Sequence, residues 1–295
     1  MQELGGGVHR VTQPLPWALD HVHCYAVDDA DGWTLIDCGL GTAGTGRRWE
    51  QALTLLGDPH VRRIVITHYH PDHIGASTRL AELTGAQEIV QGRIDRALTE
   101  RTWIDPESGP RFARFLIANG MAPADAERSA GEEDELPLAP VEPTRLVDEG
   151  DVLELAGEPF EVLVLPGHAD GHIALLGRHS GRLFGGDVLL NEITPNVGRW
   201  DDNEPDPLGR YLHTLVRIRE LAPSVVYPGH RSVVETPAAR ALEIAMHHAE
   251  RLDAHEAALR DGARTAFDVA QIVWGGRLGF HEQRFAVAEA LAHIE

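Results

Sequence analysis

Three histidines and an aspartate lie close together in the sequence THYHPDHIG, residues 67–75. They are His68, His70, Asp72 and His73, and they follow a hydrophobic run directly. Imidazole nitrogens and carboxylate oxygens are ligands that zinc accepts in proteins. A turn with alternating ligands can direct His68 and His70 to one side and Asp72 and His73 to the other. This spacing suits a pair of adjacent metal ions.

The same combination of a β-type run, a glycine and a metal-binding residue type recurs later in the chain. It gives three further candidates, which are His168 in PGHADGH, Asp187 in GGDVL and His230 in YPGH. Strand ends in α/β proteins project side chains into a shared crevice, and glycine lets the backbone approach closely. Solvated histidines or ordinary core packing do not explain this repeated context. We therefore predict that these residues form one site.

Hydrophobic periodicity indicates the elements that must position these side chains. A strand, a helix and a second strand follow one another early in the chain, which predicts a layered α/β fold rather than an all-β fold. Strands are expected at 22–27, 33–36, 61–67, 86–91, 145–155, 160–165, 172–176, 183–184 and 225–227. Helices are expected at 47–56, 74–84, 237–260, 266–273 and 282–294.

Residues 93–134 differ from their surroundings, because they combine helical sequence with many charges and several aromatic side chains. We interpret this segment as an inserted helical lid. Selectivity for a substrate must come from the walls around a metal site, since a metal ion does not recognise distant groups. We therefore expect Phe112 and Phe115 to contribute one wall of an apolar pocket, with Trp17 and Trp200 as opposing surfaces.

Composition restricts the class of partner. The chain has 295 residues with a formal net charge of -20, which disfavours binding to nucleic acid or to an anionic membrane. Its two cysteines, Cys24 and Cys38, do not have the spacing of a metal-binding pair. No signal peptide or long apolar stretch is recognisable, so we predict a cytoplasmic protein with a small-molecule substrate. A homodimer is left open.

These motifs resemble the metallo-β-lactamase superfamily, in particular its glyoxalase II-like branch of general metallo-hydrolases. The family motif H-x-H-x-D-H matches residues 68–73, and the later family ligands match His168, Asp187 and His230. Asp37 in LIDCG matches a buttressing aspartate at the end of an early strand, and His172 is expected to support its loop.

The resemblance implies an αββα sandwich with a catalytic domain at 1–236, which includes the lid at 93–134. Residues 237–295 would form a helical extension, for which a winged-helix arrangement is an alternative. We favour helices that pack on the sandwich or on a second subunit, because this tail has no basic stripe. His247 and His248 lie in the middle of the first of these helices and are expected to face solvent.

The resemblance also implies a dinuclear zinc centre, with iron or manganese as other options. One zinc would take His68, His70 and His168. The other would take Asp72, His73 and His230, and Asp187 would bridge the two. A metal-bridging hydroxide would attack a carboxylic ester, thioester or lactone, while Asp72 would orient the hydroxide and shuttle its proton.

Differences between this chain and other branches of the superfamily restrict the activities that we expect. His70 stands where dioxygen-reducing di-iron members carry glutamate, which favours zinc. Asp187 argues against β-lactamase activity, because the β-lactamases lack the bridging carboxylate. Glyoxalase II itself has a basic, tyrosine-containing glutathione site in its C-terminal helices. No matching motif is recognisable here, so glyoxalase II is expected to be a relative of this chain rather than its identity. A phosphodiesterase or nuclease with the same metals remains the main alternative, and a non-catalytic regulatory protein is a weaker one.

Overall fold

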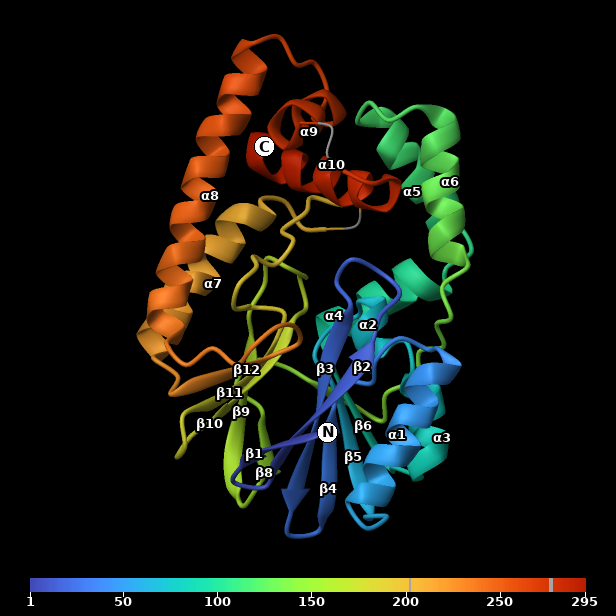
Figure 1. Cartoon of the computed structure of the whole chain (residues 1–295), viewed down its shortest axis with the longest axis vertical. Coiled ribbons are helices and arrows are strands. Elements are labelled where there is room, and N and C mark those ends of the chain that lie inside the picture. Colours follow the sequence, from blue (N-terminus) through green and yellow to red (C-terminus); the bar gives the residue numbers. More distant parts are fainter. Residues whose placement is uncertain (202, 276–277) are drawn as a thin grey trace.

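Two β-sheets form the centre of the computed structural model, which describes residues 1–201, 203–275 and 278–295 (Figure 1). The first sheet keeps chain order: β1 (Gln2–Gly5), β2 (Val8–Pro14), β3 (His21–Asp29), β4 (Gly32–Ile36), β5 (Val61–Ile66), β6 (Glu88–Gly92) and β7 (Arg145–Val147). The second sheet has the order β12 (Val225–Pro228), β11 (Arg182–Gly186), β10 (Ile173–Gly177), β9 (Glu158–Val164) and β8 (Val152–Leu155).

The core of the molecule lies between the two sheets. Side chains that alternate along the strands meet there, including Val65 of the first sheet and Phe160 and Leu175 of the second, all of them buried. Alternation places every second side chain of a strand on the same face. One hydroxyl also links the sheets, because Tyr25 on β3 donates a 2.6 Å hydrogen bond to the Pro228 carbonyl on β12.

Helices cover the outer face of each sheet (Figure 1). α1 (Ala43–Leu55) and α3 (Ser77–Thr84) pack on the first sheet, where Trp49 is buried and donates its indole N–H to the Cys38 carbonyl. α7 (Pro207–Leu221) and α8 (Pro237–Arg260) pack on the second sheet. The expected helix–sheet–sheet–helix sandwich is therefore confirmed.

A separate group of helices lies beyond one end of the sandwich (Figure 1). The group consists of α5 (Ser108–Ala118) and α6 (Pro123–Asp134) from the insertion and of α9 (Ala266–Trp274) and α10 (Phe280–Ile294) from the C-terminal region. The first helix of the insertion, α4 (Arg93–Thr99), instead contacts β6 and β7 of the first sheet, and a π-helical turn (Glu100–Ile104) links it to α5. Apolar side chains of α5, α6, α8, α9 and α10 share one cluster. The described residues after 236 contain helices and no strand. None of the described helices is long and apolar enough to cross a membrane.

The structure differs from the sequence-based expectation in several places. Residues 145–155 are two strands in different sheets, because the chain turns at Gly150, whose φ is +85°, and crosses the sandwich there. The helix expected at 74–84 is split into α2 (Pro71–Ile74) and α3. The strands β1 and β2 and the helix α7 were not predicted.

The expectation that His248 faces solvent was wrong. His248 lies on the face of α8 that packs against α10 and is buried there, with its Nδ1 3.1 Å from Nε2 of His293 on α10. The ring of His255, also buried, stacks on that of His293 with centroids 4.7 Å apart. Burial, followed by the neighbouring His293, lowers the pKa of His248 to about 3. Burial likewise lowers the pKa of His293 to about 4.

These lowered pKa values predict that the fold loses stability in mild acid. Below pH 6.5 the unfolded chain protonates histidines that the folded chain keeps neutral, so the free energy of unfolding falls as the pH drops towards 4. The slope is up to about 1.4 kcal/mol per pH unit for each such histidine. Urea unfolding between pH 7 and 4.5 should show a shallower slope for His293→Leu than for the wild type. Substitution of the exposed His60 by leucine is the control, and an unchanged slope in His293→Leu would contradict this explanation.

Candidate metal centre

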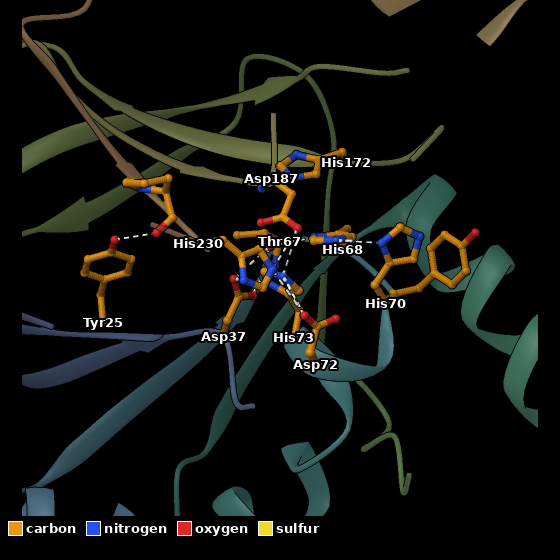
Figure 2. A network of polar contacts seen from close by, with 12 residues as sticks. Tyr25, Asp37, Thr67, His68, His70, Asp72, His73, His172, Asp187 and His230 are labelled. Atoms are coloured by element: carbon orange, nitrogen blue, oxygen red, sulfur yellow. Dashed lines mark hydrogen bonds and ion pairs between the residues drawn. The ribbon is translucent and has the colours of Figure 1, made fainter. Parts of the chain in front are cut away.

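Four strand ends bring the predicted metal ligands together at one edge of the sandwich, and Figure 2 labels all of these ligands except His168. His68 follows β5, His168 follows β9, Asp187 follows β11 and His230 follows β12. His70 precedes the short helix α2, which carries Asp72 and His73. The seven side chains fall into three overlapping triads of potential metal ligands, which are His68–His70–His168, His68–His73–Asp187 and Asp72–His73–His230.

The first triad consists of ring nitrogens alone. Nε2 of His68 lies 3.1 Å from Nδ1 of His70 and 3.3 Å from Nε2 of His168. Nitrogen atoms at this separation can all reach a single cation of the size of zinc.

The remaining triads include carboxylates, and Asp187 lies between the two ends of the cluster. Its Oδ2 is 3.2 Å from Nε2 of His230, 3.4 Å from Nε2 of His73 and 3.7 Å from Nε2 of His168. Oδ2 of Asp72 is 3.2 Å from Nε2 of His230. Asp187 thus contacts a histidine of each outer triad, which is the position that a bridging ligand requires.

The outward ring nitrogen of four histidines is held by a hydrogen bond. Nδ1 of His73 donates to Asp37, at 2.8 Å. Nδ1 of His68 is 3.0 Å from the hydroxyl of Thr67, which in turn donates to Asp37. Nδ1 of His168 and of His230 meet backbone carbonyls at 2.8 and 2.7 Å. These contacts assign the proton to Nδ1 and leave the Nε2 lone pair directed inward.

Atoms of the cluster itself indicate that its ligands fit a divalent metal ion. Nε2 of His73, Nε2 of His230 and Oδ1 of Asp187 are buried and make no hydrogen bond to the described residues. Buried polar atoms without partners are rare in folded proteins, and a metal ion would satisfy all three. Burial alone would lower the pKa of His73, but the carboxylates of Asp187 and Asp37 outweigh it and raise that pKa well above its usual value. The centre therefore attracts positive charge.

Two glycines allow the strand ends to approach this closely. Gly186 has a φ of +48°, and a Cβ there would lie 2.6 Å from Nε2 of His172. A Cβ on Gly229 would lie 2.3 Å from Oδ1 of Asp187. His172 accepts a hydrogen bond from the backbone N–H of Asp187 at 3.1 Å, so it supports the aspartate rather than facing the centre.

Asp37 itself has a left-handed backbone, with a φ of +61°. Such a conformation is costly for a residue with a side chain, and it persists only where the surroundings fix it. Here the Asp37 carboxylate accepts from the backbone N–H of Thr67 at 2.8 Å and from the ring of His73. The strained residue therefore joins the end of β5 to the helix that carries His73.

Sequence reasoning missed the residues that act through their backbone or from distant helices. The carbonyl of Asn196 accepts from His168, and the side chain of Asn196 donates to Glu289 of α10 at 3.2 Å. The N–H of Arg199 donates to the Ala288 carbonyl of α10 at 2.9 Å. A backbone acceptor carries no residue-type signal, and only the three-dimensional packing of α10 shows this connection.

A cavity of about 380 Å³ extends from the cluster towards the helices beyond the sandwich. His70, Asp72 and Asp187 line its inner end, whereas Trp17, Phe112, Trp103 and Trp200 are among the residues of its wall. Phe115 is not among the lining residues. It lies behind Trp200, with ring centroids 6.3 Å apart, because Phe112 takes the inward face of α5. Tyr69, Leu136 and Phe285 also line the cavity and were not predicted.

Known proteins are similar to this chain in sequence and in fold. The model of the metallo-beta-lactamase superfamily matches residues 17–230. The probable metallo-hydrolase YqjP of Bacillus subtilis is 28% identical over 229 residues, which are 74% of this chain and 69% of the relative. The hydroxyacylglutathione hydrolase GloC of Haemophilus influenzae is 30% identical over 211 residues, 70% of this chain and 82% of the relative.

One solved structure matches the insertion and the C-terminal helices as well as the sandwich. The metallo-beta-lactamase family protein TTHA1429 from Thermus thermophilus covers 99% of this chain, and the chain covers 93% of it, with a TM-score of 0.88 and 33% identity. Since the family model spans most of the chain, and the sandwich with its cluster of histidines and aspartates agrees with it, this protein belongs to the metallo-β-lactamase superfamily and is a metallo-hydrolase of that group.

Proposed function

We propose that this protein is a dinuclear metal hydrolase, with zinc as its metal, that cleaves a carboxylic ester, thioester or lactone. The observation that carries the proposal is the arrangement of three overlapping ligand triads at the inner end of an apolar cavity, with Asp187 between them. A cavity of this kind can place an acyl group against the cluster while its walls exclude water.

The residues divide naturally between the two metals. His68, His70 and His168 would hold one ion, Asp72, His73 and His230 would hold the other, and Asp187 would bridge them. When bound, such a pair supplies Lewis acidity and lowers the pKa of a coordinated water molecule. Nitrogen ligands together with carboxylates favour zinc, although iron and manganese accept the same donors.

Asp72 is the side chain that we assign to proton transfer. It lines the cavity, and its Oδ2 lies 3.2 Å from Nε2 of His230. A carboxylate at the boundary between cluster and cavity can orient a nucleophilic water, accept its proton and pass that proton to the leaving group. Loss of this transfer would slow the reaction more than it would weaken substrate binding.

Acyl transfer to water is favoured over phosphodiester cleavage by the relatives and by charge. GloC is named for the hydrolysis of an acyl-glutathione, which is a thioester. The net charge of -20 opposes the approach of nucleic acid, and Trp17, Phe112 and Trp200 contribute apolar surface to the cavity wall. An uncharged acyl group suits these surroundings better than a phosphodiester does.

A substrate panel tests the proposed function directly. Zinc-loaded protein should hydrolyse simple thioesters, aryl esters or lactones, and it should act on bis-p-nitrophenyl phosphate at least about a hundredfold less well in kcat/KM, a difference of roughly 3 kcal/mol in transition-state stabilisation. Metal analysis of the same preparation should give two ions per chain. A preference for the phosphodiester, or full activity with one ion or none, would overturn the proposal.

Asp187→Ala should remove the bridging carboxylate. We expect this variant to retain one metal per chain and to lose most turnover, because two dications repel each other when no anion lies between them. The measurements are metal content after dialysis and kcat on the best substrate of the panel. Asp253→Ala, on the exposed face of α8, is the matched control. A folded Asp187→Ala protein with two metals and a normal rate would disprove the bridging role.

Asp37→Asn should weaken metal binding although Asp37 is not one of the proposed ligands. The amide keeps the size of the side chain but removes the charge that orients His73 through a 2.8 Å hydrogen bond. Loss of such a supporting contact lowers metal affinity roughly 10–100-fold. Competition with a chromogenic zinc chelator measures the change, and thermal melting of the metal-free variant reports whether its fold is retained. Wild-type zinc affinity in a folded variant would contradict the role given to Asp37.

A further inference from the structure

Five large aromatic side chains contribute to the part of the cavity wall distant from the ligand cluster. Trp17, Trp103, Phe112, Trp200 and Phe285 line it, from the N-terminal region, the insertion, the loop after β11 and α10. The rings of Phe112 and Trp200 lie 5.8 Å apart, and Trp200 meets Phe285 edge-on at the same distance. Flat rings in such contact offer apolar surface to an aromatic or branched group.

The cations of this wall are already paired. The chain contains no lysine, so Arg111 and Arg284 are the permanent positive charges among the lining residues that the structure describes. Arg284 is only 3% exposed, and its guanidinium lies 3.4 Å from the carboxylate of Glu133. Arg111 lies 3.2 Å from the carboxylate of Asp201. Each guanidinium therefore already has a carboxylate partner, with which a new anion would have to compete.

Acidic side chains outnumber arginines among the described residues of this part of the wall. Glu133, Asp201 and Glu282 line it beside the two arginines. The imidazole of His281 stacks on Trp17, with centroids 5.6 Å apart, and burial, followed by the nearby Arg284, lowers the pKa of His281. A carboxylate on the substrate would therefore lose its hydration, find its potential partners occupied and meet like charge.

We propose that the group held in this distal part of the cavity is uncharged and apolar, aromatic or branched, and that carboxylate-bearing groups are rejected. The inference rests on the proposed hydrolase function and names its substrate class. It separates this chain from a glutathione-thioester hydrolase such as GloC, because glutathione carries two carboxylates. Specificity here comes from repulsion of the wrong group as well as from contact with the right one.

Matched substrates that differ by a single carboxylate test this proposal. One pair consists of the phenylacetyl and 4-carboxyphenylacetyl thioesters of N-acetylcysteamine. The other consists of the acetyl thioesters of benzyl mercaptan and 4-carboxybenzyl mercaptan, since either side of the scissile bond can occupy the distal part. The zinc-loaded wild type should favour the uncharged member of at least one pair about tenfold or more in kcat/KM. Equal rates in both pairs, or a preference for the carboxylates, would overturn the proposal.

Glu133→Gln tests the physical cause. The substitution keeps the shape of the side chain and leaves the Arg284 guanidinium without its carboxylate. The preference for the uncharged substrate should then fall about tenfold or more, because the loss of one negative charge leaves the Arg284 guanidinium uncompensated and able to attract a substrate carboxylate. Glu135→Gln, one residue past α6, exposed and outside the cavity lining, is the matched control and should keep the wild-type ratio. An unchanged ratio in a folded Glu133→Gln variant would show that this ion pair does not set the selectivity.

A binding measurement separates this proposal from the proposed function. Phenylacetamide and 4-(carbamoylmethyl)benzoate differ by the same carboxylate and need no turnover. Quenching of tryptophan fluorescence reports their binding, because Trp17, Trp103 and Trp200 line the cavity. If no ester, thioester or lactone is hydrolysed but only the uncharged amide binds, the hydrolase proposal fails and the charge selectivity stands. Equal binding of both amides would remove the charge selectivity, whatever the enzyme hydrolyses.

Discussion

The centre depends on a single constraint, which is that most of its histidines offer a lone pair inward because their other ring nitrogen is held outward. Asp37, Thr67 and two backbone carbonyls provide these outward contacts for four of the histidines. Without them the rings could rotate or change tautomer, and the inward nitrogens would no longer converge. The sandwich supplies the strand ends, but the outward hydrogen bonds turn a set of histidines into a coordination site.

The same logic explains why helices far from the strands matter to the site. The loop around Asn196 and Arg199 accepts from His168 on one side and is fastened to α10 on the other. Trp200, in the same loop, forms part of the cavity wall together with Phe285 of α10. Orientation of one histidine and the shape of the substrate pocket are therefore properties of a single short loop. The family model ends at residue 230, before the helix that holds this loop.

Much of the architecture could be predicted from the sequence, because hydrophobic periodicity and ligand spacing are local signals. The three helices after residue 236 were predicted within two residues at each end, since each combines clear periodicity with a helix-compatible start. The segment 145–155 could not be divided between two sheets, because its composition is β-type throughout and only the turn at Gly150 separates the strands. His248 looked exposed beside His247, although tertiary packing against α10 buries it.

The convergence of the seven polar side chains was also predictable in outline, since each follows a β-type run. Its supporting contacts were not. Thr67 is an ordinary residue next to a conspicuous motif, and the carbonyls of His21 and Asn196 are invisible to any analysis of residue type. The cavity was foreseen as apolar, but the ion pair between Arg284 and Glu133 joins residues about 150 positions apart, and no local pattern connects them.

The wide separation of these residues along the chain also determines when the site can exist. Its polar side chains extend from His68 to His230, and its cavity draws on Trp17 at one extreme and Phe285 at the other. Contacts of such long range form late, because closing large loops costs entropy before the contacts can compensate. A partly folded chain therefore has histidines but no coordination geometry. A cation that recognises only the finished arrangement stabilises the whole native state by mass action, and its uptake becomes part of the cooperative folding transition.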